Sequence, residues 1–344
     1  MPREAVQLPA AGSFWAAARL SGRKRQALDH NSVRNQQLER ELSIQSAQGG
    51  GCYSSQFCVA GVFVRVAGHD RDAVALAPAL LPFQNAAQFP NIEIEVEWVK
   101  DIRPSPGSQL FDSGALWTLH DNAAGYEFDF VAPVFGPSPY KRLLIDKDFS
   151  RATLKVSEAA TEIVPETSPL DYPLDELLIM HRLTQEKAVE LHGSGIVRAN
   201  GIGNLFVGHS GAGKSTTTRL WTEREDVHVL SDDRIIVRRD PSCFRGLRMY
   251  GTPWHGEAMY ASPGDAPLAR IFILQHGRGN LLTRLSPSQA VAELFARSFV
   301  PFHRHEYVDS ALAFLQEVAA AVPVYRYDFQ PDQRAVDTIL NFHD

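Results

Sequence analysis

The sequence predicts an α/β fold in the second half of the chain, preceded by a β-rich domain. In the first half, apolar and polar residues alternate with a period of two, which is typical of strands with one solvated face. The second half alternates short apolar runs with segments of helical periodicity, and a glycine-rich loop lies between one such run and one such segment. A chain of 344 residues is long enough for two such domains.

Residues 1–50 are expected to form a flexible tail outside both domains. They are polar, carry the basic run Arg23-Lys24-Arg25 and lead into three glycines at 49–51. Such a basic run can touch nucleic acid or a membrane, but it is far more often a solvated segment. A short helix is compatible with residues 33–42.

Residues 51–165 are expected to form the β-rich accessory domain. Residues 92–98 alternate Ile, Val and Trp with Glu, and the same alternation recurs at 62–66 and 126–130. Two more short strands are predicted within 143–156, and one helix near 73–81. No catalytic constellation stands out in this region, so docking or packing is its expected role.

A proline-rich stretch at 162–173 is expected to link this domain to an α/β domain at 166–344. A helix is predicted at 175–187, followed by strands around glycine-rich turns and by further helices. The predicted strands are 188–191, 195–199 and 204–207, and the predicted helices after them are 215–222, 287–298, 307–321 and 332–342.

Composition narrows the class of protein. The formal net charge of −6 gives no general attraction to nucleic acid or anionic lipid. The longest apolar run, at 73–83, is shorter than the ~20 residues of a membrane-spanning helix and contains two prolines. The three cysteines cannot all pair, and their spacing is not that of a zinc site. A cytoplasmic protein that binds neither nucleic acid nor membrane is therefore expected.

The strongest functional signal is a full match to the phosphate-loop pattern G-x-x-x-x-G-K-[ST]. It follows an apolar run and precedes a helix-compatible segment, as the motif requires. Phosphate oxygens need several backbone N–H groups at one point, and glycines leave that approach open and permit positive φ. The expected nucleotide-binding residues are Gly208, His209, Ser210, Gly211, Ala212, Gly213, Lys214, Ser215 and Thr216.

The polar side chains of this loop predict its ligands. Lys214 supplies an ammonium group for the β- and γ-phosphates, and the Ser215 hydroxyl is a hard oxygen ligand for Mg²⁺. The helix that begins near Lys214 adds the partial positive charge of its N-terminus. We therefore expect ATP, or another nucleoside triphosphate, and Mg²⁺ as cofactors.

Two aspartates follow the loop after one helix and one short strand. The strand at 227–230 runs into Asp232 and Asp233. Carboxylates at a strand end beside a phosphate loop can face Mg²⁺ or an attacking group, whereas the alternative is that they cap a turn and bond to Arg234 or Arg238. An LSGGQ-like signature and an NKxD motif are missing, which disfavours an ABC-type transport ATPase and a small GTPase.

These motifs and their order resemble the HPr kinase/phosphorylase-like family, and more closely its divergent relatives with a longer β-rich N-terminal domain. The similarity covers residues 166–344 well and 52–165 in general outline. It implies a P-loop kinase domain like the C-terminal domain of HPr kinase, and a homo-oligomer. The matching stretches are Leu191-His192-Gly193, the loop 208–215, Leu230-Ser231-Asp232-Asp233 and Gly251-Thr252-Pro253-Trp254-His255-Gly256-Glu257.

The resemblance implies roles for individual residues. Asp232 would be the general base that takes the proton of an acceptor hydroxyl, and His192 would lie near the reacting phosphate with Lys214. Asp233 would bind Mg²⁺ or orient His192, and Glu257 falls where the family places another acidic metal-site residue. The glycine-rich, arginine-containing segment that supports the reverse reaction in HPr kinase/phosphorylases is missing, so neither that reaction nor HPr as a substrate is assigned.

The expected function is therefore an ATP-dependent kinase whose acceptor is a hydroxyl, with Ser of a peptide or protein favoured. The alternatives are a small-molecule kinase and a nucleotide-binding regulator without efficient transfer. Arg270, Arg297 and Arg304 could each neutralise charge on the transferred phosphoryl group, although an exposed or paired arginine is the commoner case. The segment 252–257 is either a substrate-facing or nucleotide-facing loop or a tight turn around a buried Trp254.

Overall fold

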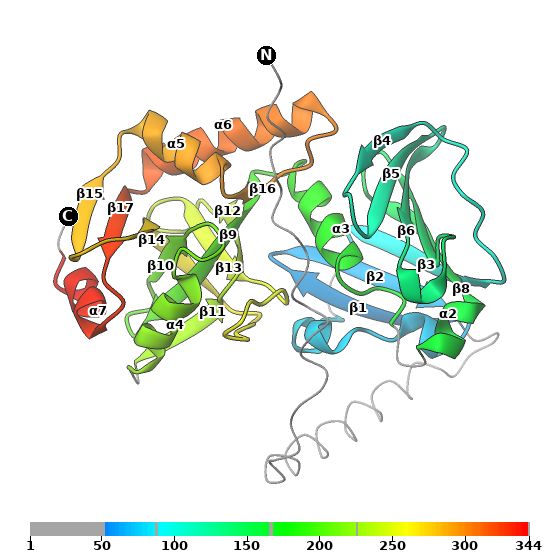
Figure 1. Ribbon diagram of the computed structural model, residues 1–344, viewed down its shortest axis with the longest axis horizontal. Helices are drawn as coiled ribbons and strands as arrows, with labels where there is room; N and C mark the ends of the chain where they lie inside the picture. Colours follow the sequence, from blue (N-terminus) through cyan, green and yellow to red (C-terminus); the bar gives the residue numbers. More distant parts are fainter. Residues whose placement is uncertain (1–51, 87–88, 165–167, 225, 343–344) are drawn as a thin grey trace, which may run out of the picture.

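The computed structural model describes residues 52–86, 89–164, 168–224 and 226–342. They form a mixed α/β structure with two large sheets, and most of the elements are strands (Figure 1). The tail predicted at 1–50, with its helix at 33–42, lies outside the described residues. None of the helices among these residues is both long and apolar enough to cross a bilayer.

The first sheet contains eight strands between Tyr53 and Ser157, so the predicted β-rich character of this region is confirmed. β3 is parallel to its neighbours β2 and β8, and the other pairs are antiparallel. The order across the sheet is β1 (Tyr53–Val59), β2 (Val62–Gly68), β3 (Ile92–Val99), β8 (Arg151–Ser157), β7 (Lys141–Asp146), β6 (Gly125–Phe130), β5 (Trp117–Asn122) and β4 (Gln109–Asp112).

The single helix predicted near 73–81 is wrong. Two short 3₁₀ helices stand there, η1 (Asp72–Val74) and η2 (Pro78–Phe83), and a third, η3 (Pro133–Phe135), precedes β7. Pro78 and Pro82 account for the difference, because proline lacks an N–H group and its ring clashes with the preceding turn of an α-helix. The predicted linker begins inside α2 (Glu158–Ile163).

The second sheet contains nine strands. β10, β14 and β17 are parallel to one another, whereas β9 is antiparallel to all four of its partners, β10, β11, β12 and β16. The strands are β9 (Ala188–Arg198), β10 (Gly203–Val207), β11 (Val227–Ser231), β12 (Arg234–Arg239), β13 (Leu247–Gly251), β14 (Asp265–His276), β15 (Leu281–Arg284), β16 (Ser298–Phe299) and β17 (Val324–Phe329).

The two strands predicted at 188–191 and 195–199 are one continuous strand, β9. Gly193 and Gly195 of this strand do not form a turn; they allow neighbouring side chains to pack closely against it. A Cβ on Gly193 would lie 3.0 Å from a Leu205 methyl carbon, and one on Gly195 would lie 2.7 Å from the terminal methyl of Ile235. The absence of side chains therefore lets neighbouring elements approach β9.

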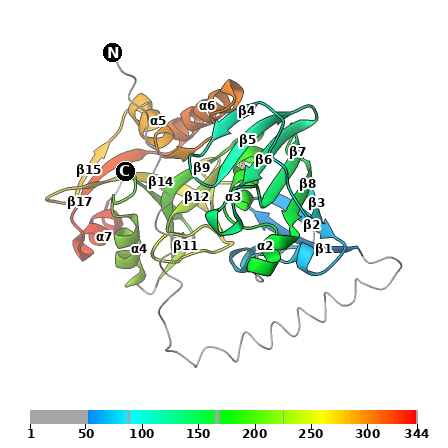
Figure 2. The same cartoon turned by 45° about the vertical axis from the view of Figure 1, so that its right-hand side comes forward.

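Helices cover both faces of the parallel strands β10, β14 and β17 (Figure 2). α5 (Pro287–Phe295) and α6 (His305–Ala321) cover one face, and α4 (Lys214–Thr222) and α7 (Gln333–Leu340) cover the other. Successive residues of β10 divide between these layers, since Leu205 and Val207 pack with α5 and α6 while Phe206 packs with α4 and α7. The four predicted helices are confirmed, with their ends shifted by a few residues.

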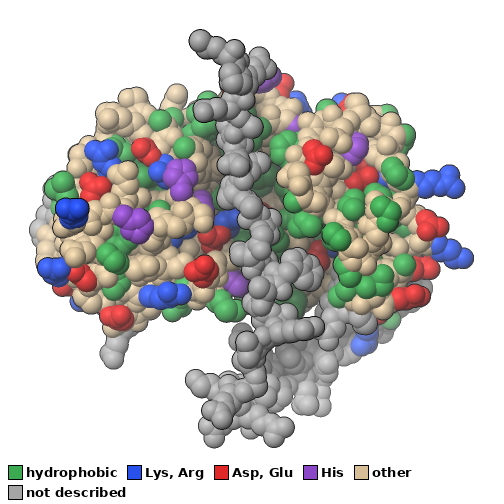
Figure 3. Space-filling model, in the orientation of Figure 1, with side chains coloured by type: hydrophobic (Ala, Val, Ile, Leu, Met, Phe, Trp, Pro, Cys, Tyr) green, Lys and Arg blue, Asp and Glu red, His purple; other side chains and the backbone are tan. Residues whose placement is uncertain are grey.

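The remaining helix, α3 (Leu174–Leu183), joins the two halves of the molecule. Its apolar face is buried in the core of the first sheet, and that core also takes in Ile236 and Trp254 from the second half. Packing therefore crosses the position at which the sequence predicts a domain boundary. The buried apolar positions of α3 are Leu174, Leu177, Leu178, Ile179 and Leu183. On the face shown in Figure 3, charged side chains of both signs are interspersed over both halves.

Candidate functional site

The glycine-rich loop connects the end of β10 to the start of α4, which is the strand–loop–helix context that the sequence predicts. Gly211 and Gly213 have φ values of 78° and 100°, in the region that favours glycine. A Cβ on Gly213 would also lie 2.5 Å from Cζ of Phe329. The loop backbone thus requires glycine at Gly213 for two independent reasons.

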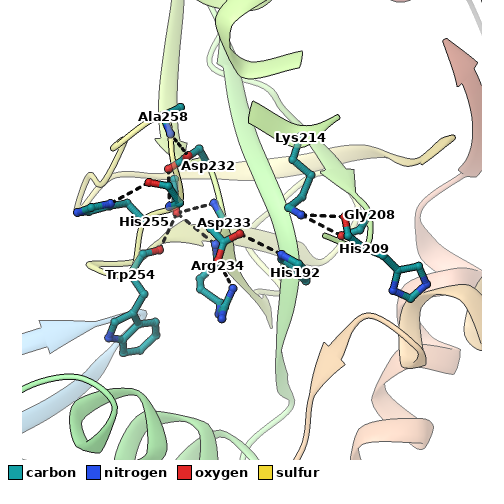
Figure 4. A network of polar contacts seen from close by, with 12 residues as sticks. His192, Gly208, His209, Lys214, Asp232, Asp233, Arg234, Trp254, His255 and Ala258 are labelled. Carbon is teal, nitrogen blue, oxygen red and sulfur yellow. Dashed lines mark hydrogen bonds and ion pairs between the residues drawn. The ribbon is translucent and has the colours of Figure 1, made fainter. Parts of the chain in front are cut away.

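Lys214 is buried at the first position of α4, and its ammonium group points back into the loop (Figure 4). Nζ donates to the carbonyl oxygens of Gly208, at 3.1 Å, and His209, at 3.2 Å. Burial lowers the pKa of Lys214 to about 8, and the nearby cations Arg234 and Arg297 act in the same direction while Asp233 opposes them. An anion bound in the loop would relieve this electrostatic cost.

The other predicted loop residues are more exposed to solvent than Lys214, and a histidine that was not predicted holds the loop backbone. His209, Ser210 and Gly211 are exposed, whereas Ser215 and Thr216 are half-buried in the first turn of α4. Nε2 of His276, at the end of β14, donates to the carbonyl oxygen of Gly211 at 2.8 Å. His276 lies 65 residues beyond that glycine, so local sequence gives no sign of the contact.

His192 and Asp233 form a pair beside the loop (Figure 4). Nε2 of His192 donates to Oδ1 of Asp233 at 2.9 Å. The backbone of β9 connects this pair to the loop, since the carbonyl oxygen of His192 accepts from the N–H of Gly208 at 3.1 Å and the N–H of Gly193 donates to the carbonyl oxygen of Asp233 at 3.0 Å. The predicted proximity of His192, Asp233 and the loop is therefore present.

The charges around this pair keep Asp233 ionised. Burial by itself would raise the pKa of Asp233, but the hydrogen bond from His192 and the positive charges of Arg234 and Lys214 outweigh it and lower the pKa. The pKa of His192 is lowered, mainly by burial, although the bond to Asp233 opposes the change. An ionised carboxylate that is a quarter exposed can accept a further hydrogen bond or contact a cation.

Asp232 has very different surroundings from its neighbour. Its side chain is fully buried, and its carboxylate accepts three backbone hydrogen bonds, from Gly256 at 3.0 Å, Ala258 at 2.8 Å and Tyr260 at 3.1 Å. These bonds order the loop 256–260 and leave the carboxylate facing it. The role of general base that the resemblance implies for Asp232 therefore does not fit this geometry, because the base needs to reach an incoming hydroxyl.

Arg234 links Asp233 to two buried glutamates that no sequence motif pointed to. Its guanidinium pairs with Asp233, donates to Glu176 of α3 at 2.7 Å and lies 3.5 Å from the Glu190 carboxylate. Burial raises the pKa of Glu190, and the proximity of Glu176 adds to the rise. The Arg234 guanidinium also lies 4.0 Å from the centre of the Phe299 ring.

The segment 252–257 is a turn around a buried tryptophan. Trp254 is 6% exposed, and its Nε1 donates to Asp175 of α3 at 3.1 Å. Burial raises the pKa of Asp175 to about 7. The first half of the segment is therefore a tight turn around Trp254, which is one of its two predicted alternatives. Glu257, in the second half, is exposed and lies between Gly256 and Ala258, whose N–H groups donate to Asp232.

The predicted metal residues do not form an all-protein metal cage. In the described ranges there is no group of three or more His, Cys, Asp or Glu side chains arranged to hold a metal ion. Mg²⁺ is commonly held by one or two protein oxygens, with the remaining positions filled by nucleotide phosphates and water. Ser215 and Asp233 provide hard oxygen atoms of that kind, so the residues present fit a nucleotide-borne Mg²⁺.

Comparisons with known proteins leave the site to be interpreted from its own geometry. A scan against protein-family models finds no match to the chain, and a search of curated proteins finds no match either.

Proposed function

We propose that this chain is a P-loop kinase, similar to the HPr kinase/phosphorylase-like family, that transfers the γ-phosphoryl group of ATP to a hydroxyl. The observation that carries the proposal is the convergence of Lys214 and the His192–Asp233 pair beside one glycine-rich loop. A nucleotide sensor needs only a loop that binds phosphate. A kinase also needs a group that removes the proton of the acceptor hydroxyl, and an ionised carboxylate beside the loop suits that task. Ser of a peptide or protein is the favoured acceptor.

The binding roles follow from the chemistry of each group. Backbone N–H groups of the loop and the Lys214 ammonium would hold the β- and γ-phosphates, and the Ser215 hydroxyl would hold Mg²⁺ together with phosphate oxygens and water. When bound, Mg²⁺ neutralises charge on the phosphate oxygens. Binding the triphosphate would raise the pKa of Lys214 again, because the anion offsets the burial and the neighbouring cations that lower it.

We assign the general base to Asp233 rather than to Asp232. In the proposed step the acceptor hydroxyl gives its proton to the Asp233 carboxylate, and its oxygen forms a bond to the γ-phosphorus. The bond from that phosphorus to the β,γ-bridging oxygen breaks, and ADP leaves with the bonding electron pair. His192 and Arg234 would position Asp233 through their hydrogen bonds and keep it ionised before the proton arrives. Most of the rate gain would come from positioning and electrostatics.

The test incubates the purified full chain with γ-labelled ATP, Mg²⁺ and a cell extract, and then separates labelled products by mass. We expect label on a peptide or protein, no nucleotide binding by Lys214→Ala, and binding without transfer by Asp233→Asn. Label only on a low-mass metabolite would favour the small-molecule kinase. Tight ATP binding without transfer to any component would instead support the nucleotide-binding regulator. Cytoplasmic location and homo-oligomer formation remain predictions.

A further inference from the structure

The three arginines that the sequence offers as partners for the transferred phosphate lie in different places. Arg304 donates to the Tyr126 hydroxyl at 3.2 Å and pairs with Glu306, and Arg270 lies over the Phe342 ring. Arg297 lies in the connection from α5 to β16, and its carbonyl oxygen accepts a hydrogen bond from the N–H of His192 at 2.8 Å. The carbonyl oxygen of His192 in turn accepts from the N–H of Gly208, the first residue of the loop. The backbone of Arg297 is therefore connected to the loop through a single residue of β9, His192.

The Arg297 side chain is buried but only partly satisfied. It is 9% exposed, and Nη1 donates to the carbonyl oxygen of Glu293 at 2.8 Å and pairs with the Glu293 carboxylate. Nε is buried and has no hydrogen-bond partner among the described residues. A buried guanidinium with an unused N–H is costly unless an acceptor is supplied. Glu293 itself is 39% exposed, so this partner can turn to water without a comparable cost.

The charge of Arg297 acts on the loop. After burial, it is the next cause that lowers the pKa of His209, and it also contributes to the lowered pKa of Lys214. Two cations, Lys214 of α4 and Arg297 of the α5–β16 connection, therefore both act on one loop. A polyphosphate bound between them would replace this repulsion with attraction.

We propose that Arg297 is a second cationic ligand of the nucleotide and contacts oxygens of its terminal phosphate. This inference rests on the proposed kinase function and names a further residue of the same site. The guanidinium offers parallel N–H donors that match phosphate oxygens in two-point contacts, and its free Nε supplies one of them. Negative charge on the transferred group is spread over its oxygens during reaction, so such a contact assists transfer as well as binding.

The test compares Arg297→Gln, Arg297→Lys and Glu293→Gln in the full chain. Calorimetry measures the dissociation constants of ADP and of a non-hydrolysable ATP analogue, each with Mg²⁺, and labelled transfer gives kcat. We expect Arg297→Gln to weaken the triphosphate analogue about tenfold while changing ADP little, and to lower kcat on the order of 10³-fold. Arg297→Lys should recover part of both losses. Glu293→Gln should leave affinity and kcat unchanged or improved, since it releases the arginine.

Two results would overturn the inference while leaving the kinase proposal standing. One is a wild-type chain that transfers phosphate alongside an Arg297→Gln variant with unchanged kcat and unchanged preference between the two nucleotides. The other is an equal loss in Arg297→Gln and Glu293→Gln, which would mean that the pair only anchors α5. If Arg297→Gln does not fold, Arg297→Lys takes its place. An unchanged ratio of its affinities for ADP and the ATP analogue would then overturn the inference. A wild-type chain that binds neither nucleotide would overturn both proposals.

Discussion

Two neighbouring carboxylates after β11 illustrate how the same residue type is given different tasks. Asp232 is fully buried and holds a loop by three backbone amides, whereas Asp233 is partly exposed and bonded to His192 and Arg234. Hydrogen bonds to an ionised group stabilise more than neutral ones do, and a buried donor left without its acceptor is costly. Asp232 therefore stabilises the loop 256–260, whereas Asp233 is the aspartate to which we assign the proposed proton transfer.

Exchanging each aspartate for asparagine separates these tasks. We expect Asp232→Asn to lower the free energy of unfolding by about 3 kcal/mol, because an amide cannot accept from all three N–H groups and presents its own donors to them. Asp233→Asn should cost less stability, about 1–2 kcal/mol, because Arg234 keeps Glu176 as a partner, and it should abolish transfer. Urea unfolding and labelled-phosphate transfer measure the two effects. Full transfer by Asp233→Asn together with loss of transfer in a folded Asp232→Asn would return the base to Asp232.

For individual residues, the sequence could identify the two aspartates as candidates but could not show which role each one has. The partners of Asp232 lie 24 to 28 positions further along the chain, and Arg234 meets Glu176 across 58 positions. Such contacts depend on how the loop 256–260 and α3 pack, which no local pattern encodes. The same reason explains why His276, Glu190 and the unpaired Nε of Arg297 were not predicted to matter.

At the scale of elements, the loop and its flanks could be predicted because their constraints are local. The apolar run before Gly208 becomes β10, and the segment from Lys214 becomes α4. β9 was harder, because glycines at 193 and 195 suggest a turn in sequence, yet in the sheet they admit Leu205 and Ile235. Only tertiary packing distinguishes these two uses of glycine.

Substituting Gly213 tests whether the loop conformation requires glycine at this position. Gly213→Ala would adopt φ 100° with a Cβ 2.5 Å from the Phe329 ring, so we expect a displaced loop and at least a tenfold loss of nucleotide affinity. Gly201→Ala is a matched control, since Gly201 has φ 75° but no atom within 4 Å of its added Cβ. It should cost about 1 kcal/mol of stability and leave affinity unchanged. Equal affinities for the two variants would contradict the steric argument.

For the whole molecule, α3 is the element that joins the two halves. It completes the core of the first sheet with five buried apolar side chains, and it also carries Asp175 and Glu176 to Trp254 and Arg234 of the second half. The segment before it supplies Asp171, which pairs with the fully buried Lys141 at 2.5 Å. The first sheet therefore depends on residues beyond the proline-rich stretch.

Fragments of the chain test this dependence. We expect a fragment of residues 52–186 to unfold cooperatively and a fragment of 52–164 to lack a cooperative transition. The shorter one loses five apolar side chains worth about 1.5–3 kcal/mol each and leaves Lys141 without its carboxylate, against a typical domain stability of about 5–15 kcal/mol. Urea unfolding followed by circular dichroism measures both. Leu178→Asp in the longer fragment is the control, and equal cooperativity of the two fragments would refute the dependence.

We expect the contact between α3 and the segment that leads into α6 to make stability depend on pH through two histidines. His181 of α3 is 1% exposed and stacks on Phe149 with ring centres 4.6 Å apart, and His303 lies before α6 with its ring centre 5.3 Å from that of His181. Burial lowers the pKa of His181 to about 3 and that of His303 to about 4, from an ordinary value of 6.5. Both are therefore neutral in the folded protein at pH 7.

Because these pKa values are lowered, the unfolded chain takes up protons first as the pH falls. The contribution of each histidine is complete above pH 6.5 and is lost progressively down to its folded pKa, so His181 should cost about 2 kcal/mol between pH 7.5 and pH 5. His181→Phe keeps an aromatic ring against Phe149 and removes the titration, so its urea midpoint should fall less over that range. His228→Gln, at an exposed histidine of β11, should follow the wild type. Parallel midpoints for wild type and His181→Phe would show that this buried ring does not set the acid sensitivity of the junction.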